Sequence, residues 1–127
     1  MNFLQTILFS LVIQPQLLLQ NHLPINKDKA VVEVVDGIVY AYNSEPGQTD
    51  NDPFITASGS RTRHGIIANN CLKFGTVVTI NEKSYEVLDR MNSRYGCNVF
   101  DIWMKEKQQA LNWGKKFEKI LILKKNR

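Results

Sequence analysis

The chain is poor in the residues that build metal centres and nucleophilic active sites. Its 127 residues include two cysteines and two histidines, with no C-x-x-C pair. His22 and His64 have no metal-ligand spacing, and we interpret His64 as a solvated side chain in a polar turn. The sequence has neither a glycine-rich phosphate loop nor the G-x-S-x-G motif of serine hydrolases. We therefore expect neither a metal nor a cofactor.

The chain also carries only a small net charge, +4 at pH 7. Lys and Arg number 16 against 12 Asp and Glu, and hydrophobic residues make up 43% of the chain. This composition and length are typical of one soluble domain and argue against a disordered chain or a multi-span membrane protein. Six of the basic residues lie between positions 115 and 127. This tail favours an anionic partner such as cell-wall polymer, acidic lipid or nucleic acid, but the sequence has no nucleic-acid-binding motif.

The first 19 residues carry no charge. An apolar run over residues 3–13 is stopped by Pro15 and is too short to span a bilayer, so it favours a signal peptide. No basic residue precedes the run and no A-x-A-like site follows it, which leaves a core or amphipathic helix as the alternative. We expect residues 1–25 to be a signal peptide or anchor plus linker, and residues 26–127 to form one domain exported to the periplasm or cell envelope.

Short alternating apolar segments separated by turns dominate the rest of the chain. They predict a mainly β fold, a small β-barrel, with one helix over Lys105–Trp113 that ends at Gly114. Asp36-Gly37 predicts a hairpin turn, and residues 81–84 predict a second one. The expected strand segments cover residues 31–35, 38–42, 54–58, 65–69, 76–80, 85–88, 100–104 and 117–123.

Two aspartates follow or interrupt apolar strand segments. Asp89 directly follows Val87-Leu88, and Asp101 lies between Phe100 and Ile102-Trp103. Desolvation of a carboxylate by such apolar neighbours raises its pKa, as general-acid catalysis requires. The structural alternative is that Asp89 pairs with Arg90 or Arg94 and that Asp101 caps a turn. Neighbouring aromatic rings favour a sugar site over this alternative, because such rings stack on sugars. These aromatics are Tyr95, Phe100 and Trp103.

Six ordered motifs add a resemblance to a known family. They cover residues 41–42, 48–50, 53–59, 67–76, 89–92 and 100–103. Together they resemble the 3D domain, a family named for three aspartates, over about residues 38–123. That family is similar to the barrel of membrane-bound lytic transglycosylase A, to rare lipoprotein A and to family 45 endoglucanases. The resemblance implies a six-stranded double-psi β-barrel that acts on peptidoglycan.

The resemblance also implies residue roles. Asp101 matches the general acid/base of lytic transglycosylases with this barrel, Asp89 matches a second aspartate in the same cleft, and Asp50 matches the third. Two positions depart from the pattern. Lys73 replaces the proline of the usual Leu-Pro-Phe-Gly turn, and Asn69 stands where rare lipoprotein A has a histidine. A histidine-assisted mechanism is therefore not supported.

The function that follows is cleavage of the β-1,4 bond between N-acetylmuramic acid and N-acetylglucosamine, with formation of a 1,6-anhydro ring. The expected partners are peptidoglycan glycan strands and no nucleic acid. We expect a monomer, and an association with the membrane periphery or envelope stays open. A non-catalytic glycan-binding barrel and an inverting glycoside hydrolase are the alternatives. Candidate substrate-binding residues are Tyr42, Asp50, Thr56, Ser58 and Asn70.

The two cysteines lie beside loops that bracket the expected cleft. Export would place Cys71 and Cys97 in an oxidising compartment, where a disulfide between them can form. The alternative is two separate buried thiols. The sequence leaves both arrangements open.

Overall fold

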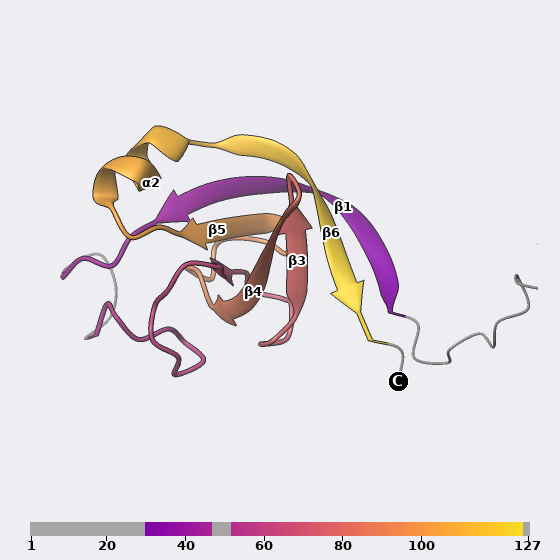
Figure 1. Ribbon diagram of the computed structural model, residues 1–127, viewed down its shortest axis with the longest axis horizontal. Helices are drawn as coiled ribbons and strands as arrows, with labels where there is room; N and C mark the ends of the chain where they lie inside the picture. Colours follow the sequence, from indigo (N-terminus) through magenta and orange to yellow (C-terminus); the bar gives the residue numbers. More distant parts are fainter. Residues whose placement is uncertain (1–29, 47–51, 126–127) are drawn as a thin grey trace, which may run out of the picture. The chain divides into compact units, whose positions relative to one another are not determined.

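A closed six-stranded barrel is the main feature of the computed structural model, which describes residues 30–46 and 52–125 (Figure 1). Its elements are β1 (Val31–Tyr42), β2 (Ile66–Ala68), β3 (Val77–Ile80), β4 (Lys83–Asp89), β5 (Val99–Trp103), α2 (Lys107–Trp113) and β6 (Lys116–Lys124). Around the barrel the strands follow the order β1-β5-β2-β4-β3-β6. The prediction of a mainly β barrel with one short helix is confirmed for the described residues. The predicted leader over residues 1–25 lies outside them.

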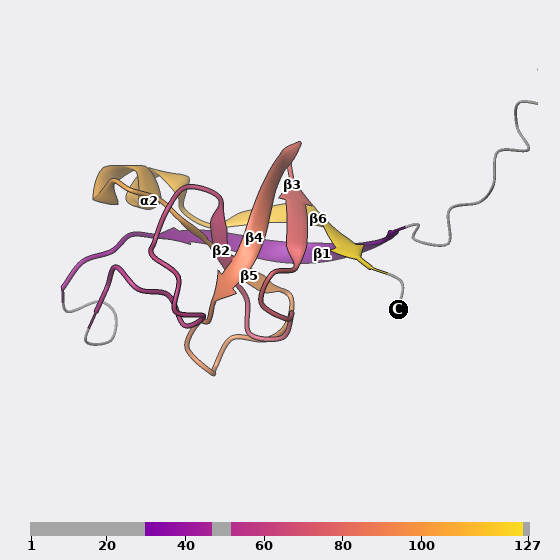
Figure 2. The same ribbon diagram turned by 60° about the horizontal axis from the view of Figure 1, so that its bottom comes forward.

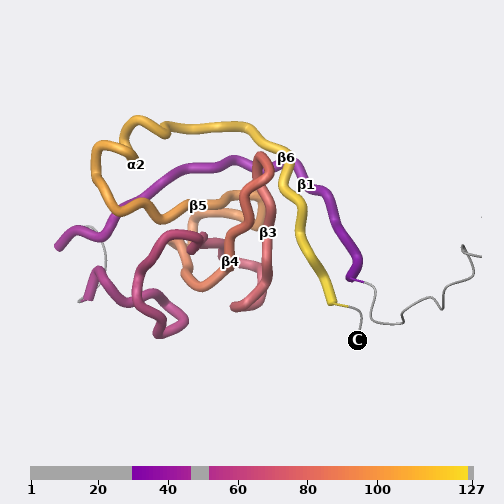
Figure 3. The backbone as a smooth tube through the Cα atoms, in the orientation of Figure 1, coloured from indigo at the N-terminus to yellow at the C-terminus, as the bar shows by residue number. Residues whose placement is uncertain are grey.

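Strand β1 is continuous, so the predicted turn at Asp36-Gly37 is wrong. Val31–Val39 pairs antiparallel with β6, and the strand continues into a parallel pairing with β5 from Ile38 to Tyr42. Figure 3 shows β1 and β6 running side by side. A Cβ on Gly37 would lie 2.6 Å from the Cδ1 of Ile120 on β6. The glycine therefore serves the close approach of two strands instead of a turn.

The second predicted hairpin is present, with a tighter turn than the four residues expected. Ile80 on β3 pairs directly with Lys83 on β4, which leaves two residues in the turn. Asn81 and Glu82 occupy these positions with φ values of 48° and 66°. Positive φ at both central positions is the geometry that matches the twist of the flanking strands.

The strand predicted over residues 54–58 is wrong. This segment makes only an isolated bridge between Ile55 and Arg61. Gly59, with φ of 87°, reverses the chain, and its amide donates to the carbonyl of Thr56. The reversal folds the segment onto itself, so its backbone is not free to pair with a neighbouring strand over its length.

Helix α2 begins two residues later than predicted and ends at Trp113, with Gly114 at φ of 68° as its C-cap. Ala110 is its buried residue. The Trp113 indole donates to the carbonyl of Val39, which ties the helix to β1. No helix within residues 30–46 and 52–125 is long and apolar enough to cross a bilayer.

The barrel core fixes which residues of β5 face outward. Phe100 and Ile102 are buried in the main core together with Val39 and Ile67. Because side chains alternate along a strand, the side chain of Asp101 lies on the opposite face of β5. In the strand pairing β2 lies between β4 and β5, and Figure 2 shows the three strands close together. The outer face of β5 is thus flanked by β1 on one side and β2 on the other.

Candidate active site

Asp101 lies in the middle of β5, and its carboxyl group is largely removed from water. In the strand register it stands between Tyr40 on β1 and Ala68 on β2. Its Oδ1 atom is buried and has no hydrogen-bond partner among the described residues. Burial, and secondarily the negative charge of Asp89, raise the pKa of Asp101 to about 7. This carboxyl can therefore hold a proton at neutral pH and release it again.

Asp89 ends β4 and is surrounded by hydrogen-bond donors. The Tyr42 hydroxyl donates to its Oδ2 at 2.6 Å. The backbone amides of Ala57 and Arg90 both donate to its Oδ1 at 2.9 Å. Three donors hold this carboxylate in one orientation. Asp89 is therefore a fixed neighbour of Asp101.

Tyr42 connects this pair to the rest of the barrel. Its ring packs against a second apolar cluster of Ile66, Leu88 and Trp103. Burial, followed by the charge of Asp89, raises the pKa of the Tyr42 hydroxyl, which therefore stays protonated and acts as a donor. The sequence placed Tyr42 among the substrate-binding residues, and its hydroxyl is engaged with Asp89 in the structure.

The arginines that follow Asp89 are occupied elsewhere. Arg90 donates to the carbonyl of Asn69 at 2.7 Å and lies over the Phe74 ring, 3.9 Å from its centroid. Arg94 lies over the Tyr95 ring and donates to its hydroxyl. The alternative in which Asp89 forms a structural ion pair with either arginine is therefore wrong, and Asp101 lies in a strand instead of capping a turn.

The loop over residues 56–60 is brought against the end of β4. Ser58 donates its amide to the carbonyl of Leu88, next to the bond from Ala57 to Asp89. The hydroxyls of Thr56 and Ser58 lie 2.9 Å apart. Thr56 is 5% exposed, whereas Ser58 is half-buried. Ser58 is thus the more accessible of the two predicted substrate-binding hydroxyls.

Asn70 has its side-chain amide bound to backbone. Its Nδ2 donates to the carbonyls of Asn92 and Tyr95, and its Oδ1 accepts from the amide of Met91. It therefore shapes the loop after β4, and this leaves few hydrogen bonds for a sugar. Asp50, the third predicted aspartate, lies outside the described residues.

Asn69 is a structural residue that the sequence reasoning did not single out for this role. It is fully buried, and its Nδ2 donates to the carbonyls of Cys97 and Val99. Its Oδ1 accepts from the amides of Cys71 and Leu72. Four satisfied bonds explain how an amide can be buried without cost. The signal in the sequence was a polar residue directly after the apolar strand 66–68.

A disulfide joins Cys71 to Cys97, with 5.2 Å between their Cα atoms. It lies beside Asn69, which bonds to the backbone of both cysteines. The two contacts together fix the turn after β2 to the segment that leads into β5. They therefore hold the start of the strand that carries Asp101. Residues 30–46 and 52–125 contain no group of three His, Cys, Asp or Glu residues placed to hold a metal.

Comparisons with known protein families and curated proteins identify no relative of this chain, so a function has to be assigned from the geometry of the candidate site. No protein-family model matches the chain, and no curated protein matches it. What can be assigned therefore rests on Asp101, on Asp89 and on the residues that hold them.

Proposed function

We propose that this protein is a lytic transglycosylase of peptidoglycan, in which Asp101 is the general acid and base. The observation that carries the proposal is the carboxyl of Asp101, buried with an unpartnered oxygen and with its pKa raised to about 7 beside a second carboxylate. Perturbed carboxyl pairs of this kind are typical of catalytic sites. The resemblance of the motifs to the 3D domain points to the same two residues.

One carboxyl group suffices for the proposed reaction. Asp101 gives its proton to the glycosidic oxygen as the bond to N-acetylglucosamine breaks. The Asp101 carboxylate then takes a proton from the 6-hydroxyl of the muramic acid, whose oxygen bonds to its own anomeric carbon. The proton count of Asp101 is restored, and no water is consumed. A pKa near neutral suits both transfers.

Asp89 has a supporting role in this mechanism. Its negative charge helps to keep Asp101 protonated. Both oxygens of Asp89 already accept hydrogen bonds, two at Oδ1 and one at Oδ2. An inverting hydrolase needs a second carboxylate that is free to activate water. The three bonds leave Asp89 about one of its roughly four acceptor positions for a water, which supports the lytic reaction over the hydrolytic one.

The proposal extends to the type of barrel and to the location of the protein. Two parallel strand pairs, β1 with β5 and β2 with β4, are separated by the antiparallel pair of β5 and β2, and the other neighbouring strands pair antiparallel, which supports a double-psi arrangement. The disulfide supports an oxidising compartment such as the periplasm or cell envelope. Both features agree with glycan strands as the partner.

Mass spectrometry of purified peptidoglycan after digestion tests the proposed activity. Fragments that end in 1,6-anhydromuramic acid are expected. Fragments with ordinary reducing ends would instead identify a hydrolase. Binding of the glycan without any new fragments would identify a binding module.

A further inference from the structure

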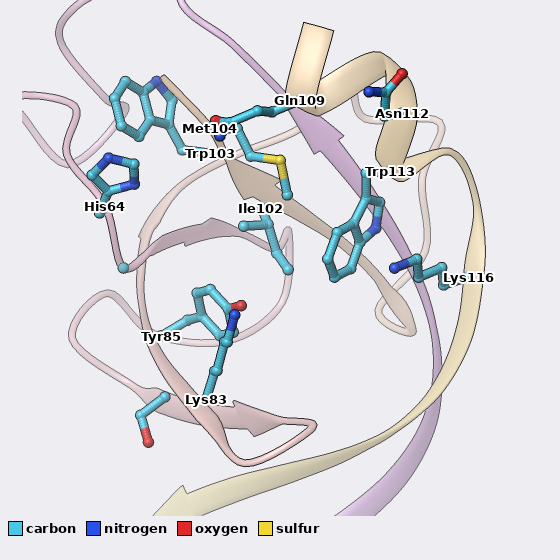
Figure 4. A pocket seen from close by; sticks show the side chains of 12 residues that line it. His64, Lys83, Tyr85, Ile102, Trp103, Met104, Gln109, Asn112, Trp113 and Lys116 are labelled. Carbon is cyan, nitrogen blue, oxygen red and sulfur yellow. The ribbon is translucent and has the colours of Figure 1, made fainter. Parts of the chain in front are cut away.

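A pocket of about 740 Å³ opens between α2, the β3–β4 hairpin and the end of β5 (Figure 4). Ile102 and Met104 line it with apolar side chains, and both also belong to the barrel core or pack against it. Trp103, Trp113 and Tyr85 add aromatic surface. The proposed mechanism assigns no role to this pocket, although its volume lies in the range of ligand sites.

The charged residues that line the pocket have one sign. Lys83 comes from the hairpin and Lys116 from the start of β6, and Figure 4 shows them on opposite sides of the pocket. No aspartate or glutamate is among the lining residues. The ammonium group of Lys116 lies 3.6 Å from the centroid of the Trp113 ring. This contact holds one positive charge in place before any ligand arrives.

The aromatic walls are also fixed in place. The Trp113 indole donates to the carbonyl of Val39, and the Trp103 indole donates to the hydroxyl of Ser44. His64 lies edge-on to Trp103 with 5.6 Å between the ring centroids. Because these walls are already fixed, the protein would lose less side-chain entropy when a ligand binds. The pocket therefore fits an anionic ligand that has some apolar surface.

Trp103 connects the pocket to the candidate active site. It follows Asp101 by two residues on β5, and it packs in the same cluster as Tyr42, whose hydroxyl bonds to Asp89. Along β5, Asp101 lies two residues, roughly 7 Å, from Trp103 at the pocket wall, so Trp103 is the link between a glycan at Asp101 and the pocket. In peptidoglycan, the side groups that carry carboxylates are the short peptides on muramic acid.

We propose that this pocket binds the acidic stem peptide of the glycan strand, with Lys83 and Lys116 holding its carboxylates. The inference rests on the proposed function for its substrate. In this proposal the pocket recognises the peptide, and Asp101 cleaves the glycan to which the peptide is attached. The protein should therefore prefer glycan that carries peptides with free carboxyl groups.

Tryptophan fluorescence tests the proposal without any need for cleavage. The chain has two tryptophans, Trp103 and Trp113, and both line this pocket. The full chain is titrated with a disaccharide tetrapeptide from peptidoglycan, and separately with the same compound after amidation of its carboxyl groups. The acidic compound should change the emission and should bind roughly tenfold more tightly than the amidated one, as expected for two ion pairs at a pocket rim.

Variants assign the effect to the pocket. The double variant Lys83→Gln/Lys116→Gln should remove the preference for the acidic compound. The matched control is Lys119→Gln, on the same strand as Lys116 but paired with Asp36 outside the pocket, and it should keep the preference. Equal affinity for both compounds, unchanged emission with either, or an equal effect of the control would overturn the proposal. A tryptophan response without any cleavage of peptidoglycan would contradict the lytic function and leave peptide binding in place.

Discussion

The Tyr42 hydroxyl donates to Asp89 Oδ2 at 2.6 Å across 47 residues of sequence. Tyr42 ends β1 and Asp89 ends β4, and β5 and β2 lie between these strands in the barrel. The bond therefore bridges the face of β5 that carries Asp101. It orients the Asp89 carboxylate, whose charge contributes to the raised pKa of Asp101.

Removal of the Tyr42 hydroxyl should weaken this bridge. Tyr42→Phe keeps the ring that packs on Ile66 and Trp103, and it deletes the donor to Asp89. Since a hydrogen bond to a charged group contributes roughly 1.5–3 kcal/mol, the free energy of unfolding should fall by about that amount. Urea denaturation measures the change. An unaltered unfolding midpoint would show that the bond contributes nothing to stability.

The stability of the fold should depend on the protonation of Asp101. The pKa of Asp101 is raised to about 7 in the folded protein, so the folded state binds more protons than the unfolded state between about pH 4 and 7. Stability therefore falls as the pH rises through this window, by on the order of 4 kcal/mol when complete. An asparagine cannot ionise, so Asp101→Asn does not lose stability as the pH rises, and it should be more stable than the wild type at pH 8.

Thermal unfolding from pH 4 to pH 8 measures this difference. The advantage of Asp101→Asn should shrink toward pH 4. Asp89→Asn is the matched control, and it should be less stable than the wild type at pH 8 because three donors lose a charged acceptor. A constant difference between Asp101→Asn and the wild type at every pH would contradict the raised pKa.

The close approach of β1 and β6 should not tolerate a side chain at position 37. In Gly37→Ala the new Cβ would meet Ile120 Cδ1 at 2.6 Å, and crowding of this kind costs roughly 1–3 kcal/mol. Gly96→Ala is the control, because a Cβ there meets only Asn98 Oδ1, at 3.6 Å. Urea denaturation should show a loss for the first variant and little change for the second. Equal effects would remove the packing role assigned to Gly37.

The disulfide should contribute substantially to the stability of the barrel. Cys71 and Cys97 are 26 residues apart, and closing a loop of this length is worth roughly 3 kcal/mol in the chain-entropy view. Thermal unfolding of Cys71→Ala/Cys97→Ala should show this loss, and the wild type in reductant should show the same. Two titratable thiols in unfolded, unreduced protein taken from the cell envelope would contradict the pairing.

A strand could be predicted from the sequence where its alternation of apolar and polar residues matches the faces that are buried and exposed in the fold. The segment predicted over residues 76–80 contains β3 (Val77–Ile80), because Val78 and Ile80 on one face of that strand are buried in the core. The hairpin predicted from Asp36-Gly37 is wrong because this residue pair indicates only a local preference for a turn, and β1 continues through it. The glycine is required by the approach of Ile120 from β6, a residue that lies 83 positions further along the chain.

Sequence reasoning named Asp89 and Asp101, and it attributed the desolvation of Asp101 to Phe100, Ile102 and Trp103. Phe100 and Ile102 point into the core, on the other face of β5 from the carboxyl. Trp103 lies on the same face as Asp101 and belongs to the cluster against which Tyr42 packs. Sequence neighbours on a strand do not share a face, so this arrangement requires the fold.

The pH dependence of cleavage should follow the proton on Asp101. A general acid must be protonated at the start of each turnover, so the rate should fall as the pH rises through about 7. Release of fragments from purified peptidoglycan between pH 5 and 9 measures the profile. A rate that rises across this range would indicate a catalytic base with no acid role for Asp101.

The most direct test of the account is the rate at which Asp101→Asn releases 1,6-anhydro fragments from peptidoglycan, measured by mass spectrometry beside the wild type and Asp89→Asn. Asparagine keeps the size of the side chain and cannot cycle a proton. We predict a fall of roughly 10²–10⁴-fold for Asp101→Asn and a smaller fall for Asp89→Asn. Thermal unfolding confirms that each variant is folded. Release by folded Asp101→Asn at the wild-type rate would contradict the assignment of Asp101 as the acid and base.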